Sequence, residues 1–266
     1  MKRRPSDSVA ARNQHLLTLI LAIKNEHPFW GFRRVWAYLK YRDGLAVNKK
    51  RIYRLMKAHD LLVTPNFRLR AKRSNLRPKP RASRPNEFWG IDMTKIKMAG
   101  WGWIYLTVVL DWYTKEIVGA SASIQSKTTD WLRALHQAVQ ARFPRGIREA
   151  PTLCLISDNG CQPTSQHFMQ ECSILGIHQI FTTWSNPKGN SDTERVMRTI
   201  KEDLVWPYEW DNPFDFELAL RQWIERYNAD FPHQALENRT PRQHYQHFVS
   251  QRLTQQGQSL SSFALA

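Results

Sequence analysis

The chain has 266 residues, a hydrophobic fraction of 42% and a formal net charge of +16. This length suits one large core with a smaller module beside it, and the 11 Trp and 12 Phe exclude a disordered basic tail. The longest apolar run near the start, residues 16–23, is far shorter than the roughly 20 residues that cross a bilayer, and no apolar signal segment precedes it. We therefore predict a cytoplasmic protein.

The positive charge is concentrated in the first third of the chain. Residues 1–91 contain 22 Lys and Arg against 5 Asp and Glu, whereas the remaining residues contain 17 basic and 18 acidic side chains. Such a surplus predicts a polyanionic partner, because each phosphate that a cation neutralises releases condensed counterions. Nucleic acid and an anionic membrane surface are the two candidates, and the short apolar runs disfavour the membrane.

Residues 1–63 have helical periodicity and form the first expected domain. In its last helix Asn48 is a suitable N-cap, and Ile52, Leu55 and Met56 share one face. A short connection containing Gly44 precedes this helix, which is typical of a helix-turn-helix whose second helix enters the major groove. A solvated basic helix in a small bundle is the alternative, but the charge surplus favours DNA binding. The predicted DNA-binding residues here are Lys49, Lys50, Arg51 and Arg54.

Residues 64–86 have no periodic apolar face. They contain eight Lys and Arg, no acidic residue and four Pro, so we predict an extended linker that lies along a phosphate backbone. A passive spacer is the alternative, and the eight unopposed cations disfavour it. The predicted DNA contacts in this linker are Arg68, Arg70, Lys72 and Arg73.

Residues 87–250 form the second expected domain, followed by a flexible tail at 251–266. Three strands of an antiparallel meander come first, and helices and strands then alternate, which predicts an α/β fold with a mixed five-stranded sheet flanked by helices. Most tryptophans, among them Trp101 and Trp103, are expected in the core, whereas Trp184 is the one expected to stack on DNA. The strands are expected at 88–98, 103–113, 116–123, 152–157 and 177–183, and the helices at 127–142, 164–175, 191–206 and 213–229.

Three carboxylates of this domain have a chemical reason to meet. Asp92 interrupts an apolar strand, and Asp158 directly follows another strand. Glu194 lies in the first turn of a helix that Asn190, Ser191 or Asp192 can cap. Separately, each has an ordinary explanation: a strand-end residue, a turn former and a surface ion pair. Together they would repel one another unless a divalent cation bound them. Carboxylate oxygens suit Mg²⁺ or Mn²⁺, and two such ions activate an attacking hydroxyl and stabilise a leaving oxygen of a phosphodiester.

Four motifs occur in a fixed order along this domain. Asp92 lies in "FWGIDMTKI", Asp158 in "LISDNG" and Glu194 in "GNSDTERVMRTIKED", and "RYNADFPHQALENRTPRQHY" follows them. Asp158 and Glu194 have 35 residues between them, and Lys201 stands seven residues beyond Glu194. In this order and spacing, the chain resembles the catalytic subunits of bacterial insertion-sequence transposases, which belong to the DDE transposase and retroviral integrase superfamily. The helices before the core resemble the helix-turn-helix that commonly precedes it.

The resemblance implies a ribonuclease H-like core that cleaves and transfers DNA strands at the ends of an insertion sequence, using water or a 3′-hydroxyl as nucleophile. It implies that Asp92, Asp158 and Glu194 are the catalytic metal ligands for Mg²⁺ or Mn²⁺, with two ions per site, and that Lys201 contacts DNA. Arg198 shares its helical face and is expected to face phosphate as well. Asp192 is expected to cap the helix, and Glu202 and Asp203 are expected to be solvated.

The same resemblance implies partners and a location. The partners are the terminal repeats and target DNA, further copies of the chain on that DNA, and an upstream helix-turn-helix subunit that is supplied separately or as a frameshift fusion. The location is the bacterial cytoplasm, in association with the nucleoid. The chain departs from the pattern at Phe231, where many relatives have Arg before Pro-His, and in its short approach from Gly189 to Glu194.

Two rival functions remain open on the sequence. A non-catalytic DNA-binding protein that retains the integrase fold would bind DNA without metal and without strand chemistry. A general nuclease would cleave DNA with no preference for terminal sequences.

Overall fold

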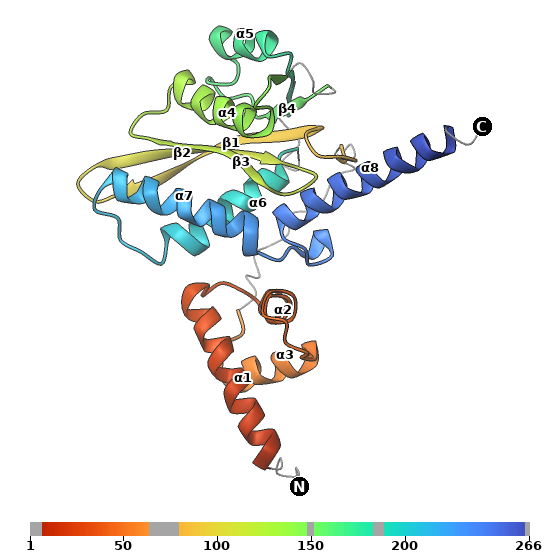
Figure 1. Cartoon of the computed structure of the whole chain (residues 1–266). Helices are drawn as coiled ribbons and strands as arrows, with labels where there is room; N and C mark the ends of the chain where they lie inside the picture. The colour runs from red at the N-terminus through yellow and green to blue at the C-terminus, as the bar shows by residue number, and fades with distance from the viewer. Residues whose placement is uncertain (1–6, 64–79, 148–151, 183–188, 264–266) are drawn as a thin grey trace, which may run out of the picture. The chain divides into compact units, whose positions relative to one another are not determined.

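The computed structural model describes residues 7–63, 80–147, 152–182 and 189–263, without the side chains of 7–10 and 256–263. The chain divides into two compact units (Figure 1). The N-terminal unit comprises Met1–Lys72 together with Asp230–Arg239, and the core unit comprises Arg73–Ala229 together with Thr240–Ala266.

The N-terminal unit is helical, as the sequence predicts. It contains α1 (Asp7–Glu26), α2 (Phe32–Ala37), which continues as a π-helical turn, and α3 (Lys49–Ala58). Asn48 caps α3, because its Oδ1 accepts a 2.8 Å hydrogen bond from the backbone N–H of Lys50. Ile52 and Met56 of α3 are fully buried, so the predicted apolar face of this helix is its packing face.

The segment Asp230–Arg239 belongs to this N-terminal unit, although the sequence pattern assigns it to the core. Phe231 is buried, and its ring meets those of Trp30 and His27 nearly edge-on, with centroid distances of 4.8 and 5.0 Å. Asp230 Oδ1 accepts a 2.8 Å hydrogen bond from Arg42 Nε. Phe231, the departure from the family pattern, is therefore a core residue of the N-terminal unit.

The core unit is built on a mixed five-stranded sheet in the order β3-β2-β1-β4-β5, which confirms the predicted fold class. β1 pairs with β2, and β2 with β3, as antiparallel neighbours, whereas β4 lies parallel to both β1 and β5. The strands are β1 (Phe88–Met98), β2 (Gly102–Asp111), β3 (Ile117–Ser123), β4 (Cys154–Ser157) and β5 (His178–Phe181).

Helices cover both faces of this sheet (Figure 1). On one face lie α4 (Thr128–Arg142) and α5 (Gln166–Ile174), whose apolar residues share a buried cluster with Trp89 and Ile91 of β1. On the other face lie α6 (Ser191–Ile200), continued by a π-helical turn (Lys201–Val205), and α7 (Pro213–Asp230). The last helix, α8 (Pro241–Phe263), runs through residue 250, where the sequence pattern suggested the start of a tail.

Two tryptophans contradict the expectation that they belong to the core. Trp101 and Trp103 are each 49% exposed, at the turn end of the β1–β2 hairpin, because they lie where no helix covers that face. Trp89 and Trp112 are buried as expected, and Trp184 lies outside the described residues. No helix in the described part of the chain is long and apolar enough to cross a membrane.

Candidate active site

Asp92 and Asp158 occupy matching positions on neighbouring parallel strands. β1 pairs with β4 as far as Gly90, which lies opposite Ile156. The same register, continued by two residues, sets Asp92 opposite Asp158, just past the end of β4. Because neighbouring strands lie about 5 Å apart, the sheet brings the two residues close together at the carboxyl ends of its parallel strands, where α/β proteins bind ligands.

Each of these aspartates makes a local hydrogen bond to the backbone. Asp92 Oδ1 accepts from the N–H of Met93 at 2.8 Å, and Asp158 Oδ1 accepts from the N–H of Gly160 at 3.1 Å. Asp158 is exposed, whereas Asp92 is partly buried within the sheet. One carboxylate is therefore fixed in a strand and the other stands at the start of a loop.

Helix α6 packs its first turn onto β1 at a position without a side chain. A Cβ added at Gly90 would lie 2.1 Å from Thr193 Oγ1 and 2.7 Å from Asn190 Oδ1, well inside van der Waals contact. Thr193 is itself fully buried and precedes Glu194. Glycine at position 90 therefore allows the helix that carries Glu194 to lie against the strand that carries Asp92.

Two hydrogen bonds hold this turn of α6 in place. Asn190, the N-cap residue, donates from Nδ2 to the carbonyl oxygen of Ile91 at 3.1 Å, immediately before Asp92. The indole Nε1 of Trp112 donates to Thr193 Oγ1 at 3.3 Å. Both bonds are buried, so each is sheltered from competing water.

An ion pair is the third anchor of α6. Lys115, in the β2–β3 turn, donates from Nζ to Asp192 Oδ2 at 2.8 Å and to the carbonyl oxygen of Trp112 at 2.6 Å. The Lys115 and Asp192 side chains are only 20% and 27% exposed. The N-cap is Asn190, so the expectation that Asp192 caps the helix is wrong. Asp192 lies in the first turn instead, where its charge also complements the helix dipole.

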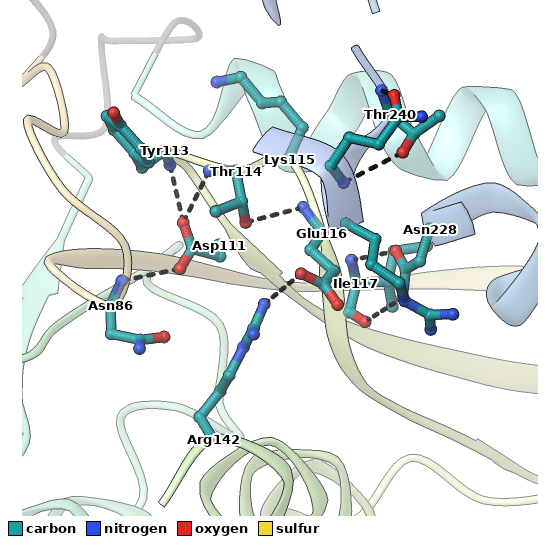
Figure 2. A network of polar contacts seen from close by, with 12 residues as sticks. Asn86, Asp111, Tyr113, Thr114, Lys115, Glu116, Ile117, Arg142, Asn228 and Thr240 are labelled. Carbon is teal, nitrogen blue, oxygen red and sulfur yellow. Dashed lines mark hydrogen bonds and ion pairs between the residues drawn. The ribbon is translucent and has the colours of Figure 1, made fainter. Parts of the chain in front are cut away.

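The β2–β3 turn that supplies Lys115 is fixed by the buried carboxylate of Asp111 (Figure 2). Asp111 Oδ1 accepts from the N–H groups of Tyr113 and Thr114, at 2.8 and 3.0 Å, and Oδ2 accepts from that of Asn86 at 2.7 Å. Burial raises the pKa of Asp111, while these hydrogen bonds favour its charged form. Lys115, the next residue of the turn, has a left-handed conformation with φ of 61°.

The same turn is also tied to two helices. Asn228 of α7 accepts from the N–H of Ile117 and donates to its carbonyl oxygen, both at 3.0 Å, and Figure 2 shows this paired contact. Arg142, at the end of α4, forms a largely buried ion pair with Glu116. The position of Lys115 therefore follows from the packing of the whole core unit rather than from a free loop.

The other two predicted carboxylates are among the charged groups that act on Asp92. The pKa of Asp92 is raised to about 6, mainly because the carboxyl is desolvated, and further by the charges of Asp158 and Glu194. The Lys201 ammonium and the hydrogen bond from Met93 oppose this rise. Asp158, Glu194 and Lys201 are therefore near enough to act electrostatically on Asp92.

The donor set fits a hard divalent cation in its chemistry. Asp92, Asp158 and Glu194 would offer carboxylate oxygens, the ligands that Mg²⁺ and Mn²⁺ prefer, and the charges of Asp158 and Glu194 disfavour ionisation of Asp92. In the described part of the chain, however, no three Asp, Glu, His or Cys side chains stand close enough as placed to hold one ion. The exposed side chains of Asp158 and Glu194 would have to turn toward Asp92 to share a cation.

The other charged residues of α6 differ in their surroundings. Lys201 begins the π-helical turn, a feature that is frequent at functional sites. Arg198 is 67% exposed and forms a 2.7 Å ion pair with Glu202. Asp203 is only 4% exposed, so the expectation that it is solvated is wrong.

The basic residues predicted on α3 are mostly available to a ligand. Lys49, Lys50 and Arg54 are exposed, and Lys49 Nζ lies 4.3 Å from the ring centroid of Trp36. Arg51 is partly buried and donates from Nε and Nη2 to Asn13 of α1, which makes it a packing contact within the unit. The linker residues Arg68, Arg70, Lys72 and Arg73 lie outside the described residues.

Sequence patterns give little sign of the residues that position α6. Gly90, Thr193 and Lys115 come from three separate segments and meet only in the folded core. The one available signal is Gly90 itself, because glycine inside a strand pattern indicates a close approach of another backbone.

Comparisons with known proteins agree with this architecture. Residues 82–187 and 175–241 each match a family model described as "Integrase core domain", and residues 11–68 match one described as "HTH-like domain". The chain is 26% identical over 237 residues to "Insertion element IS2A uncharacterized 48.2 kDa protein" of Escherichia coli, covering 87% of this chain and 56% of that protein. It is 28% identical over 230 residues to "Transposase for insertion sequence element IS629" of Shigella sonnei, covering 82% and 75%.

A solved structure shares the fold. A chain in the cryo-EM structure of the simian T-cell lymphotropic virus intasome in complex with PP2A regulatory subunit B56 gamma superimposes with a TM-score of 0.52 and 19% sequence identity. The match covers 79% of this chain and 73% of that chain. The likeness concerns the fold, a mixed sheet with helices on both faces.

Proposed function

We infer that this chain, which belongs to the integrase core family, is a DNA transposase that cleaves and joins strands at the ends of an insertion sequence. The observation that carries this proposal is the geometry that sets Asp92 opposite Asp158 on neighbouring strands and packs the helix of Glu194 against the same strand at Gly90. The charges of Asp158, Glu194 and Lys201 all act on Asp92. A strand residue surrounded by like charge, with one cation beside it, suits a site that accepts metal and phosphate together.

We assign metal binding to Asp92, Asp158 and Glu194, and two Mg²⁺ or Mn²⁺ ions fit the proposed reaction. When bound, such ions supply an activated hydroxyl nucleophile and neutralise charge on the leaving oxygen. The carboxylates then need no proton-transfer role, because their task is to hold oxygen ligands at fixed positions. Asp92 provides the rigid side of the site, and Glu194 is positioned through the anchors of α6.

We assign phosphate binding near the reacting bond to Lys201 and Arg198. The Lys201 ammonium acts electrostatically on Asp92, so a phosphate bound to Lys201 would lie beside the carboxylates. Arg198 would exchange its exposed pairing with Glu202 for a phosphate, and this exchange costs little because exposed ion pairs contribute roughly 0–1 kcal/mol. In the N-terminal unit, Lys49, Lys50 and Arg54 are the exposed cations for duplex binding.

The proposed partners are insertion-sequence ends, target DNA and further copies of the chain, since joining requires two ends to be held together. The matched region spans only 56% of the IS2A relative, which therefore contains additional sequence. From the family resemblance we propose that an upstream subunit, separate or fused, assists the reaction. The proposed location is the bacterial cytoplasm, at the nucleoid.

The decisive test compares wild-type protein with Glu194→Gln on supercoiled DNA that carries the element's own ends, in Mg²⁺ or Mn²⁺, with any upstream subunit added. Glu217→Gln is the matched control, because it removes a partly exposed carboxylate of α7 whose ion pair with Arg221 lies within that helix. We expect Glu194→Gln to bind the ends normally and to lose cleavage and joining, while Glu217→Gln remains active.

Two other results would support the rival functions. Equal metal-independent binding with no turnover in any variant would indicate a DNA-binding protein that retains the integrase fold. Cleavage without preference for the element's ends would indicate a general nuclease.

A further inference from the structure

The turn end of the β1–β2 hairpin has lysines and aromatic rings on one face. Lys95 lies opposite Tyr105 in the strand register, and Lys97 lies opposite Trp103. The lysine Nζ atoms are 5.6 Å from the Tyr105 ring centroid and 5.4 Å from that of Trp103. We call these four residues the hairpin face. The indole of Trp103 is half exposed there, which is unusual for the largest apolar side chain.

The opposite face of the same hairpin is fully packed. Ile96, Met98 and Ile104, which alternate with the residues of the hairpin face, are 2%, 1% and 0% exposed. The strand alternation therefore fixes the hairpin face toward solvent. In Figure 1 the hairpin turn projects beyond the end of α4, the helix that covers this side of the sheet.

The hairpin face carries positive charge without a nearby acid in its own strands. Residues 93–110 contain Lys95 and Lys97 and no Asp or Glu. The side chains of Lys95 and Lys97 are exposed, and Trp103 lies beside them. This arrangement is complementary to a polyanion that also presents flat apolar surfaces.

Nucleic acid fits this surface better than a protein partner does. Lysine is depleted in protein–protein interfaces, whereas lysines beside exposed aromatic rings are typical of single-strand binding surfaces. In duplex DNA the faces of the bases are stacked on one another. A duplex would therefore contact the two lysines through its phosphates, without a base stacked on the aromatic rings. A single strand offers phosphates to the lysines and an unpaired base to Trp103.

We propose that the hairpin face binds single-stranded DNA, with Lys95 and Lys97 on its phosphates and Trp103 stacked on a base. The inference rests on the proposed function, since strand cleavage and joining expose unpaired nucleotides. It concerns a separate surface, because Asp92 and Lys95 point to opposite faces of β1. The hairpin face therefore binds a part of the DNA strand that has left the site containing Asp92 or has not yet entered it.

Binding of a labelled oligothymidylate to the full chain, measured by fluorescence anisotropy in EDTA, tests this proposal. We expect Trp103→Ala to weaken binding on the order of 10-fold, and Trp103→Phe to retain most of it. The Lys95→Gln/Lys97→Gln variant should lower the slope of log affinity against log salt by about 1.4, which is the value for two lost phosphate contacts on a single strand.

The matched control is Arg221→Gln/Arg226→Gln, which removes two exposed cations from α7, on the other face of the sheet. It should leave both affinity and slope unchanged. The proposal is overturned if the hairpin variants match wild type, if duplex binding falls as much as single-strand binding, or if Trp103→Ala changes only self-association in sedimentation. Because EDTA stops turnover, these results are independent of whether Glu194→Gln abolishes strand joining.

Discussion

The two ends of the β1–β2 strand pair have the same backbone geometry and opposite surroundings. At the end that contains Gly90 and Asp111, a helix, a turn and buried hydrogen bonds leave no room for a methyl group. At the turn end, Trp103 is half exposed, and the cations beside it contact only neighbouring rings among the described residues. Burial fixes groups in position for chemistry, whereas exposure leaves groups available to a flexible ligand. Substitutions at the two ends should differ accordingly.

The largest expected effect is at Asp111. Asp111→Ala leaves three backbone N–H groups without their acceptor in a buried turn, so the free energy of unfolding should fall by about 3 to 4 kcal/mol. Urea denaturation measures this loss. Asp111→Asn keeps one carbonyl acceptor and should lose distinctly less; equal losses would mean that the hydrogen bonds are not what stabilises the turn.

Gly90→Ala should have the second-largest effect on stability and the largest effect on activity. The added Cβ overlaps Thr193 Oγ1, so α6 must move, at a cost of about 1 to 3 kcal/mol. A displaced Glu194 should lower strand transfer on the order of 100-fold. Gly31→Ala is the control, because a Cβ there meets nothing within 4 Å. Normal transfer by Gly90→Ala would show that the position of α6 does not limit catalysis.

Asp92→Asn should stabilise the metal-free protein at neutral pH. The folded-state pKa of about 6 lies above the ordinary value of 3.8, so the native state favours protonated Asp92. That preference stabilises the fold at low pH and is lost as the pH rises through 6. Thermal unfolding in EDTA should show a gain of about 3 kcal/mol for the variant at pH 7.5 and less than about 1 kcal/mol near pH 4. A gain that does not depend on pH would have another cause.

Lys115→Met and Asp192→Asn should be coupled. Each breaks the same partly buried ion pair, so the double variant should lose less stability than the sum of the single losses, with a coupling energy of about 1 kcal/mol. Strand transfer should fall roughly 10-fold in each single variant, while affinity for DNA ends stays constant. Strictly additive losses would show that the pair does not hold α6.

The smallest effect is expected at the turn end. Lys97→Ala removes an exposed cation near Trp103, so the free energy of unfolding should change by less than about 0.5 kcal/mol. Thermal unfolding checks this value. A loss comparable to that of Gly90→Ala would remove the contrast between the two ends.

Local patterns predicted the elements better than their contacts. β1 has the predicted bounds, since its β-branched and aromatic side chains suit a pleated, half-buried surface. The helix after Asn190 was also predicted, but not its π-helical turn at Lys201. Asp203 is buried and Trp103 is half exposed, which is the reverse of what these residue types usually prefer. Neighbours distant in sequence decide which faces are covered.

In the candidate site, too, local patterns identify some residues, whereas others are identified only by their contacts in the folded chain. Spacing and chemistry single out Asp92, Asp158 and Glu194, because carboxylates in apolar or strand-end positions need a partner. Nothing local marks Lys115, whose link to Asp192 spans 77 positions. Phe231 looked like a lost DNA contact, and only its packing against Trp30 gives it a structural role.

The grouping of residues 230–239 with the N-terminal helices makes that unit discontinuous in sequence. During synthesis its first helices emerge early, yet Phe231 reaches Trp30 only after most of the core unit has left the ribosome. Maturation of the first unit therefore waits until residues 230–239 have been synthesised. A fragment that ends at the linker would lack part of its own core, and a fragment that begins there would carry an unmatched aromatic side chain.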